Sequence, residues 1–215
     1  MTLSASDQWG MIHAERARVA DMLDGLGTRQ WRSATLCGEW TVEQVVAHLT
    51  AAAHTGTWAW LRSMTLAGFN AGRHNARRLA EHLGDTPQQT GQKFRDAVTL
   101  TIAPTKDHAA WLGEVIVHGQ DIARPLGIEL TPAPEAVGEV AAFFAAKDFA
   151  VNSHTAVDGL RLEADDTAFT AGEGPVVRGP LLSLVMAMAG RGDYCAELDG
   201  AGAAELRRRI AGTTA

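Results

Sequence analysis

Glu114 and His118 stand four residues apart in a stretch, 111–122, whose apolar residues recur at helical intervals. In a helix this spacing places both side chains on one face. If that face points inward, a carboxylate and an imidazole can bind one metal ion, and one more ligand would complete the three-ligand, open arrangement of a catalytic zinc site. His48, on the apolar side of a second predicted helix, is the best candidate for that ligand. The three residues therefore predict a metal centre built from two helices.

The same residues also have simpler interpretations. An isolated Glu-x-x-x-His pair is typical of a solvated helix face or of a hydrogen-bonded pair in the core. His48 alone could be a satisfied, half-buried histidine. Asp121, one turn beyond His118, could accept the second imidazole N–H or be an ordinary surface aspartate. No comparable partner at metal-ligand spacing accompanies the other histidines, which are His13, His54, His74, His82, His108 and His154.

The elements that must position these residues are long helices. Thr41 to Gln44 has the Thr-x-x-Gln form of a capping box, which predicts a helix that begins at Thr41 and extends to about Leu66. The spacing of apolar residues predicts further long helices over about 9–26, 87–101 and 106–126. Four such helices favour a bundle, a fold in which metal ligands commonly project from facing helices.

Beyond the bundle the pattern changes. A fifth helix is predicted over about 134–151, and the segment 160–164 then alternates like a strand. Residues 172–180 are typical of a turn between short strands, and helices follow over 181–189 and 201–211. The sequence thus predicts a mainly α protein, with a helix-bundle domain over residues 1–154 and a small α/β domain over 155–215.

Composition excludes several functional classes. Lys and Arg number 19 against 25 Asp and Glu, giving a formal net charge of −6, which disfavours nucleic-acid binding. The longest apolar stretch, 181–189, is too short to cross a bilayer. Only Cys37 and Cys195 occur, so no disulfide framework is readable. Cys37 stands beside the start of the helix at Thr41 and could have a lowered pKa there, but a buried, inert thiol is the expectation. We expect a cytoplasmic monomer or homodimer that binds neither nucleic acid nor membranes.

Four short segments carry a family resemblance. Residues 37–49 contain Trp-Thr-Val followed by Ala-His-Leu, and residues 114–121 have the form Glu-x-x-x-His-x-x-Asp. Residues 174–180 read Gly-Pro-x-Val-x-Gly-Pro, and Gly190-Arg191 follows. In order and spacing these segments resemble the mycothiol-dependent maleylpyruvate isomerase family, whose larger domain is a DinB-like four-helix bundle.

The resemblance implies a function and a set of site residues. His48, Glu114 and His118 would bind a divalent metal, with Zn²⁺ expected, and mycothiol would serve as a low-molecular-weight thiol cosubstrate. The metal would activate the thiol as a thiolate for isomerisation of an unsaturated acid or for S-transfer to a small electrophile. Arg191 is the candidate for stabilising the anion, since a guanidinium pairs bidentately with a carboxylate.

Two departures from the family pattern leave other functions open. Relatives often have Pro-Gly before the tryptophan, whereas this chain has Gly38-Glu39 before Trp40, and the C-terminal domain is short. One alternative is a non-catalytic metal-binding or regulatory module. Another is a hydrolase that uses zinc-bound hydroxide, which needs the same metal but no thiol.

Overall fold

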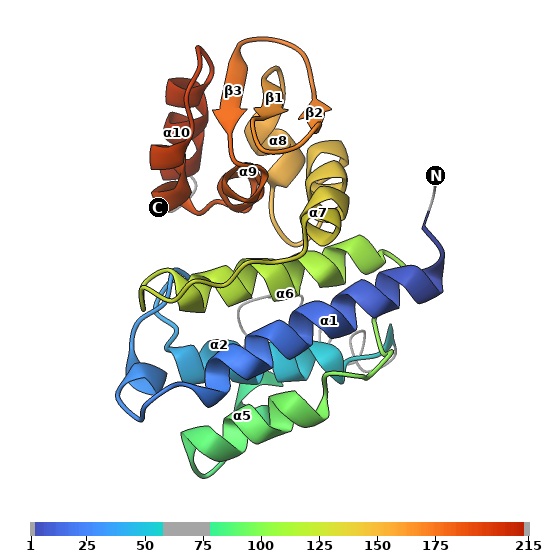
Figure 1. Ribbon diagram of the computed structural model, residues 1–215, viewed down its shortest axis with the longest axis vertical. Coiled ribbons are helices and arrows are strands. Elements are labelled where there is room, and N and C mark those ends of the chain that lie inside the picture. Colours follow the sequence, from blue (N-terminus) through green and yellow to red (C-terminus); the bar gives the residue numbers. More distant parts are fainter. Residues whose placement is uncertain (1–2, 58–77, 213–215) are drawn as a thin grey trace. The chain divides into compact units, whose positions relative to one another are not determined.

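A computed structural model describes residues 3–57 and 78–212 of the chain (Figure 1). It is mostly helical, and a small three-stranded sheet lies in the C-terminal part. The chain divides into two compact units, Met1–Pro132 and Ala133–Ala215. The predicted fold class, a mainly α protein with a small C-terminal α/β unit, is confirmed.

The first unit is a bundle of helices around one apolar core. Its long helices are α1 (Ala5–Asp24), α2 (Val42–Ala53), α5 (Pro87–Asp96) and α6 (His108–Ala123), and a single 3-10 turn, η1 (Gln30–Arg32), follows α1. Each of α1 and α2 packs against both α5 and α6 (Figure 1). The buried residues of this core are Val19, Ala20, Leu23, Leu26, Trp31, Val42, Val45, Val46, Leu49, Phe94, Val115 and Ile122.

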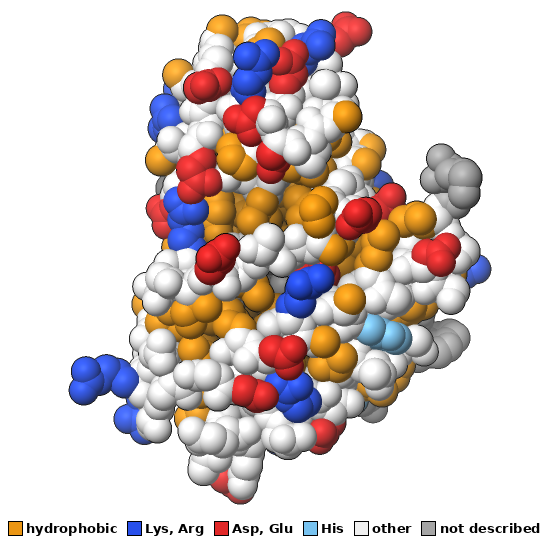
Figure 2. Space-filling view, in the orientation of Figure 1, with side chains coloured by type: hydrophobic (Ala, Val, Ile, Leu, Met, Phe, Trp, Pro, Cys, Tyr) orange, Lys and Arg blue, Asp and Glu red, His pale blue; other side chains and the backbone are white. Residues whose placement is uncertain are grey.

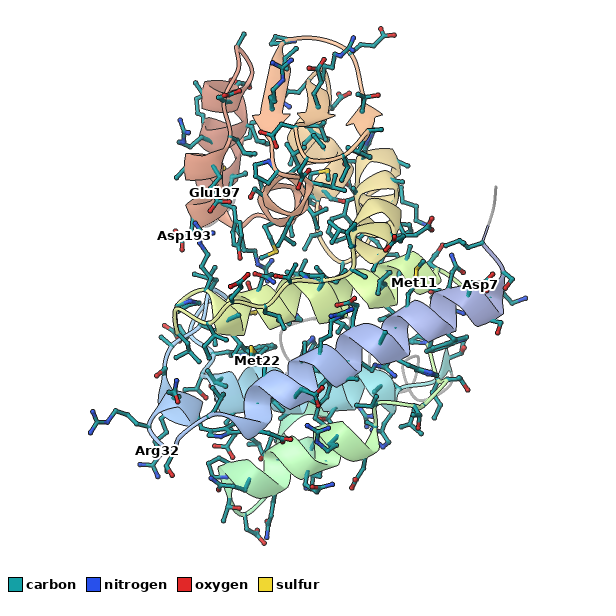
Figure 3. The ribbon with its side chains drawn as sticks, in the orientation of Figure 1. Asp7, Met11, Met22, Arg32, Asp193 and Glu197 are labelled. Atoms are coloured by element: carbon teal, nitrogen blue, oxygen red, sulfur yellow. The ribbon has the colours of Figure 1, made fainter. Side chains whose placement is uncertain are left out.

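Local capping determines where the first two long helices begin. Ser4 and Asp7 form a capping box at the start of α1, and Figure 3 shows Asp7 at that end of the helix. Thr41 and Gln44 form the predicted capping box of α2: the Gln44 N–H donates to Thr41 Oγ1, and the Thr41 N–H donates to Gln44 Oε1 at 2.9 Å. Each box satisfies backbone donors that the first helical turn leaves unpaired.

The end of α2 comes earlier than the sequence predicts. The helix stops at Ala53, and His54 is its C-terminal cap. Thr55 Oγ1 donates back to the Ala51 carbonyl at 2.6 Å, and this bond secures the turn. The prediction of a continuous helix to Leu66 is therefore wrong at residue 54, because the Thr55 N–H bonds to the Ala52 carbonyl three residues back and does not continue the α-helical ladder. Residues 58–66 of that prediction lie outside the described residues.

The second unit combines helices with the sheet. Its helices are α7 (Pro134–Ala146), α8 (Ser153–Val157), α9 (Leu181–Met188) and α10 (Ala203–Ala211), and a 3-10 segment, η2 (Gly192–Glu197), joins the last two. The strands are β1 (Arg161–Ala164), β2 (Thr170–Ala171) and β3 (Val176–Gly179), in the order β2-β1-β3. The central strand β1 pairs antiparallel with β2, Leu162 opposite Ala171, and parallel with β3, Leu162 opposite Val177.

The boundary between the units lies after Pro132, so the predicted division into 1–154 and 155–215 is placed too late. Helix α7 belongs to the second unit because it packs against α9. The segment before it belongs to the bundle, since the side chains of Leu126, Ile128 and Leu130 pack against the bundle core. Gln120 Nε2 also donates to the Leu130 carbonyl at 2.7 Å, which ties this segment to α6.

The surface shows no concentration of one charge on the face drawn in Figure 2, where basic and acidic side chains are intermingled. Within residues 3–57 and 78–212, none of the helices combines the length and the apolar character that crossing a bilayer requires.

Candidate metal centre

The bundle brings the three predicted ligands together. His48 projects from α2, and Glu114 and His118 project from neighbouring turns of α6, which packs against α2. One ligand atom from each side chain lies within 4.8 Å of the corresponding atom of the other two. The helical spacing of Glu114 and His118 places these two side chains together on α6, and the packing of α2 against α6 brings His48 to them.

The distances fit a shared ion. His48 Nε2 lies 3.1 Å from Glu114 Oε2, and His118 Nε2 lies 3.3 Å from the same oxygen. Two ligands that bind one Zn²⁺ at about 2.1 Å in tetrahedral geometry are about 3.4 Å apart. The His48 and His118 rings stand edge to face, with their centroids 4.9 Å apart. The donor set, two imidazole nitrogens and one carboxylate, therefore suits a zinc-like divalent ion with an open coordination position.

The second nitrogen of His118 is also held. Nδ1 lies 2.9 Å from Asp121 Oδ2, and the Asp121 side chain is 0% exposed. An Nδ1–H that donates to this carboxylate leaves the lone pair of Nε2 directed at the centre, as a metal ligand requires. Of the two readings of Asp121 from the sequence, the structure matches the buried acceptor and excludes a surface aspartate.

Burial and hydrogen bonds shift the pKa values of Glu114 and His118 in opposite directions. Burial acts to raise the pKa of Glu114, but hydrogen bonds from His118 and His48 outweigh burial and hold that pKa well below its usual range. Burial acts to lower the pKa of His118, yet its hydrogen bonds, above all with Asp121, raise that pKa well above the usual range. Glu114 is thus an anion next to positive charge, and a divalent ion would replace that charge.

Two further side chains lie beside the centre. The Trp40 ring packs against the His48 ring, with the centroids 5.1 Å apart, and limits the positions the imidazole can take. Cys37 is partly exposed, and its sulfur lies within 4.8 Å of ligand atoms of His118 and Asp121. The expectation that Cys37 is buried is wrong, and the loop that carries it folds onto α6; its inertness stays a prediction. In the sequence, Cys37 stands three residues before the Trp-Thr-Val segment, and this position is the signal that pointed to the site.

Arg191, the predicted anion-binding residue, lies in the second unit. It directly precedes η2, and its Nη1 donates to the Ala189 carbonyl at 2.6 Å. Its role toward a substrate stays a prediction. In the part of the chain that the structure describes, no histidine other than His48 and His118 joins a group of three potential metal ligands.

Comparison with known proteins identifies the family. Residues 12–104 match the family model of the mycothiol maleylpyruvate isomerase N-terminal domain, and residues 131–209 match that of the C-terminal domain. The chain belongs to the mycothiol-dependent maleylpyruvate isomerase family. The predicted resemblance is thus confirmed, and the two matched domains agree with the two compact units. The N-terminal match includes His48 and ends before Glu114 and His118.

Solved structures of the family share the fold. A crystal structure of the mycothiol-dependent maleylpyruvate isomerase superimposes on this chain with a TM-score of 0.67 at 17% identity, covering 94% of this chain and 97% of the other. A histidine-to-alanine mutant of the mycothiol-dependent maleylpyruvate isomerase gives a TM-score of 0.66 at 16% identity, with the same coverage. At this identity the likeness shows the fold alone. No curated protein sequence matches the chain significantly.

Proposed function

We propose that this member of the maleylpyruvate isomerase family is a metal-dependent enzyme that uses mycothiol to isomerise a small unsaturated acid, or that joins the mycothiol thiolate to a small electrophile. The observation that carries the proposal is the convergence of His48, Glu114 and His118, whose ligand atoms lie within 4.8 Å of one another. The sequence resemblance and the two matched domains support the thiol and the isomerase class.

Each side chain at this centre has its own role in the proposal. His48, Glu114 and His118 hold the ion, for which Zn²⁺ suits the two nitrogens and one oxygen. A bound divalent cation would supply stabilisation of a thiolate, the nucleophilic form of a thiol. Asp121 keeps the Nδ1 proton of His118 in place, and Trp40 supports the His48 ring. The chain therefore needs no cysteine of its own as the nucleophile.

Arg191 completes the proposal as an anion-binding residue. An enolate or carboxylate of the substrate would pair with its planar guanidinium through two parallel hydrogen bonds, a geometry that lysine does not offer. If Arg191 acts in this way, Arg191→Lys should retain metal and lose turnover, because it keeps the charge and loses the paired donors.

The test starts with metal content. We expect the purified protein to hold one divalent ion per chain, measured by elemental mass spectrometry, and His48→Ala and Glu114→Gln to lose it. His154→Ala is the matched control, since His154 is exposed and its Nδ1 bonds to the Ala145 carbonyl in the second unit. A metal-free wild type, or a His48→Ala protein with unchanged metal and activity, would refute the proposal.

Turnover then separates the candidate functions. We expect the metal-loaded wild type to convert a cis-unsaturated keto acid such as maleylpyruvate, or to alkylate mycothiol with a small electrophile, only when mycothiol is present. Ester or amide hydrolysis without mycothiol would instead identify a metal hydrolase. Tight metal binding without any turnover would identify a non-catalytic module.

A further inference from the structure

Three potential ligands form a second group that overlaps the metal centre. The sulfur of Cys37, a ring nitrogen of His118 and a carboxylate oxygen of Asp121 all lie within 4.8 Å of one another. Asp121 faces the Nδ1 side of His118, at 2.9 Å, whereas Glu114 faces the Nε2 side, at 3.3 Å. The carboxylates of Asp121 and Glu114 therefore face opposite edges of one imidazole ring.

The backbone holds Cys37 in this position. The Leu36 N–H donates to the Asp121 carbonyl at 3.1 Å, which fastens the loop before α2 to α6. The Cys37 N–H donates to Thr35 Oγ1 at 3.1 Å, and Thr35 Oγ1 in turn donates to the Trp40 carbonyl at 2.8 Å. The loop is thus bonded on both sides of the thiol, so the closeness of Cys37 to α6 is built into the fold.

We propose that Cys37, His118 and Asp121 form a second metal site, selective for thiophilic ions such as Cd²⁺ or Cu⁺, whose occupation excludes an ion from the first centre. Thiolate ligands favour soft ions, whereas the two imidazoles and one carboxylate of the first centre have no sulfur. Cys37 is partly exposed, so an arriving ion can meet the sulfur first, while Asp121 is fully buried behind it.

Exclusion follows from the chemistry of the shared ring. A neutral imidazole carries one proton and offers one lone pair. When Nε2 binds an ion at the first centre, Nδ1 keeps the proton and donates it to Asp121. When Nδ1 binds a soft ion, the ring proton moves to Nε2, where Glu114 Oε2 is an acceptor 3.3 Å away. Cys37 loses its thiol proton to solvent as the sulfur–metal bond forms. A ring that stays neutral therefore serves one ion at a time.

Cadmium titration of the metal-free, full-length protein tests the site, because a thiolate–cadmium bond gives an ultraviolet charge-transfer band. We expect the band in the wild type, in Cys195→Ser and in His48→Ala, and its loss in Cys37→Ser. Affinity in Cys37→Ser should fall on the order of 100-fold, since losing even an outer partner of a ligand costs 10–100-fold. Cys195→Ser is the matched control because that buried thiol lies in the second unit.

The outcomes separate this proposal from the function proposed above. Only the claim that the two sites exclude each other rests on that proposed function. With Zn²⁺ and Cd²⁺ both present, we expect the bound ions to total one per chain, and two per chain would overturn exclusion. A band that persists in folded Cys37→Ser, or is absent from the wild type, would overturn the site. Because His48→Ala abolishes the first centre and leaves the second, its cadmium band reports the second site even if the first holds no metal. Thermal unfolding of Cys37→Ser and Cys37→Ala checks that both variants fold.

Discussion

Asp121→Asn tests most directly whether the buried carboxylate organises the metal centre. In the wild type Asp121 Oδ2 lies 2.9 Å from His118 Nδ1, and its side chain is fully buried. An asparagine keeps the shape and removes the negative charge that holds the Nδ1 proton. The lone pair of His118 Nε2 is then no longer fixed toward the ion, and the ligand becomes less basic.

The expected magnitude follows from the position of this carboxylate. Loss of an outer partner of a metal-bound histidine costs 10–100-fold in affinity, which corresponds to about 1.4–2.7 kcal/mol. We expect the Zn²⁺ affinity of Asp121→Asn, measured by competition with a chromophoric chelator, to fall within that range. The upper end is favoured because no solvent reaches the carboxylate to replace its hydrogen bond.

A control separates the local effect from a general loss of negative charge. Asp96→Asn removes an exposed carboxylate at the end of α5, which accepts a hydrogen bond from Gln92. We expect this variant to keep wild-type affinity. If Asp121→Asn bound zinc as tightly as Asp96→Asn, with both proteins folded by circular dichroism, the assignment of Asp121 as the partner of His118 would be refuted.

Two further predictions concern stability. Burial, together with the electrostatic effect of His54 and of nearby basic side chains, lowers the pKa of His82 to about 4. Between about pH 6.5 and pH 4, His82 is therefore protonated in the unfolded chain and neutral in the folded chain. The stability that neutral His82 contributes is therefore fully present above about pH 6.5 and is lost across that window. Between pH 7 and pH 5 the free energy of unfolding, measured in urea, should fall by less in His82→Gln than in the wild type, and an equal change in the two proteins would contradict this. Gly172 and Gly159 have matching φ values of 73° and 71°, but a Cβ on Gly172 would lie 2.2 Å from a backbone oxygen and one on Gly159 would meet nothing within 4 Å. Gly159→Ala should cost about 1–2 kcal/mol for its backbone alone, and Gly172→Ala clearly more, in urea unfolding; equal costs would count against the close contact.

Much of the fold was predictable because its signals are local. The Thr41–Gln44 capping box needs only one helical turn, and the structure begins α2 where the sequence predicts. The alternation at 160–164 likewise predicts the strand β1, which pairs in the structure with the nearby strand β3. The end of α2 was not predictable, because the apolar pattern continues past Ala53, whereas the backbone turns at His54. The position of the unit boundary depends on the packing of α7 against α9, and no local sequence pattern specifies that contact.

The sequence by itself determined that Glu114, His118 and Asp121 share one side of a helix, because a spacing of three or four residues fixes their direction. Only the tertiary structure decided that His48 Nε2 lies 3.1 Å from Glu114 Oε2, since this depends on the packing of α2 against α6. It also decided that Cys37 lies beside His118, because the backbone N–H of Leu36 donates to the carbonyl of Asp121. Periodicity fixes the direction of a side chain within its own helix, whereas its distance to another helix depends on how the whole core packs.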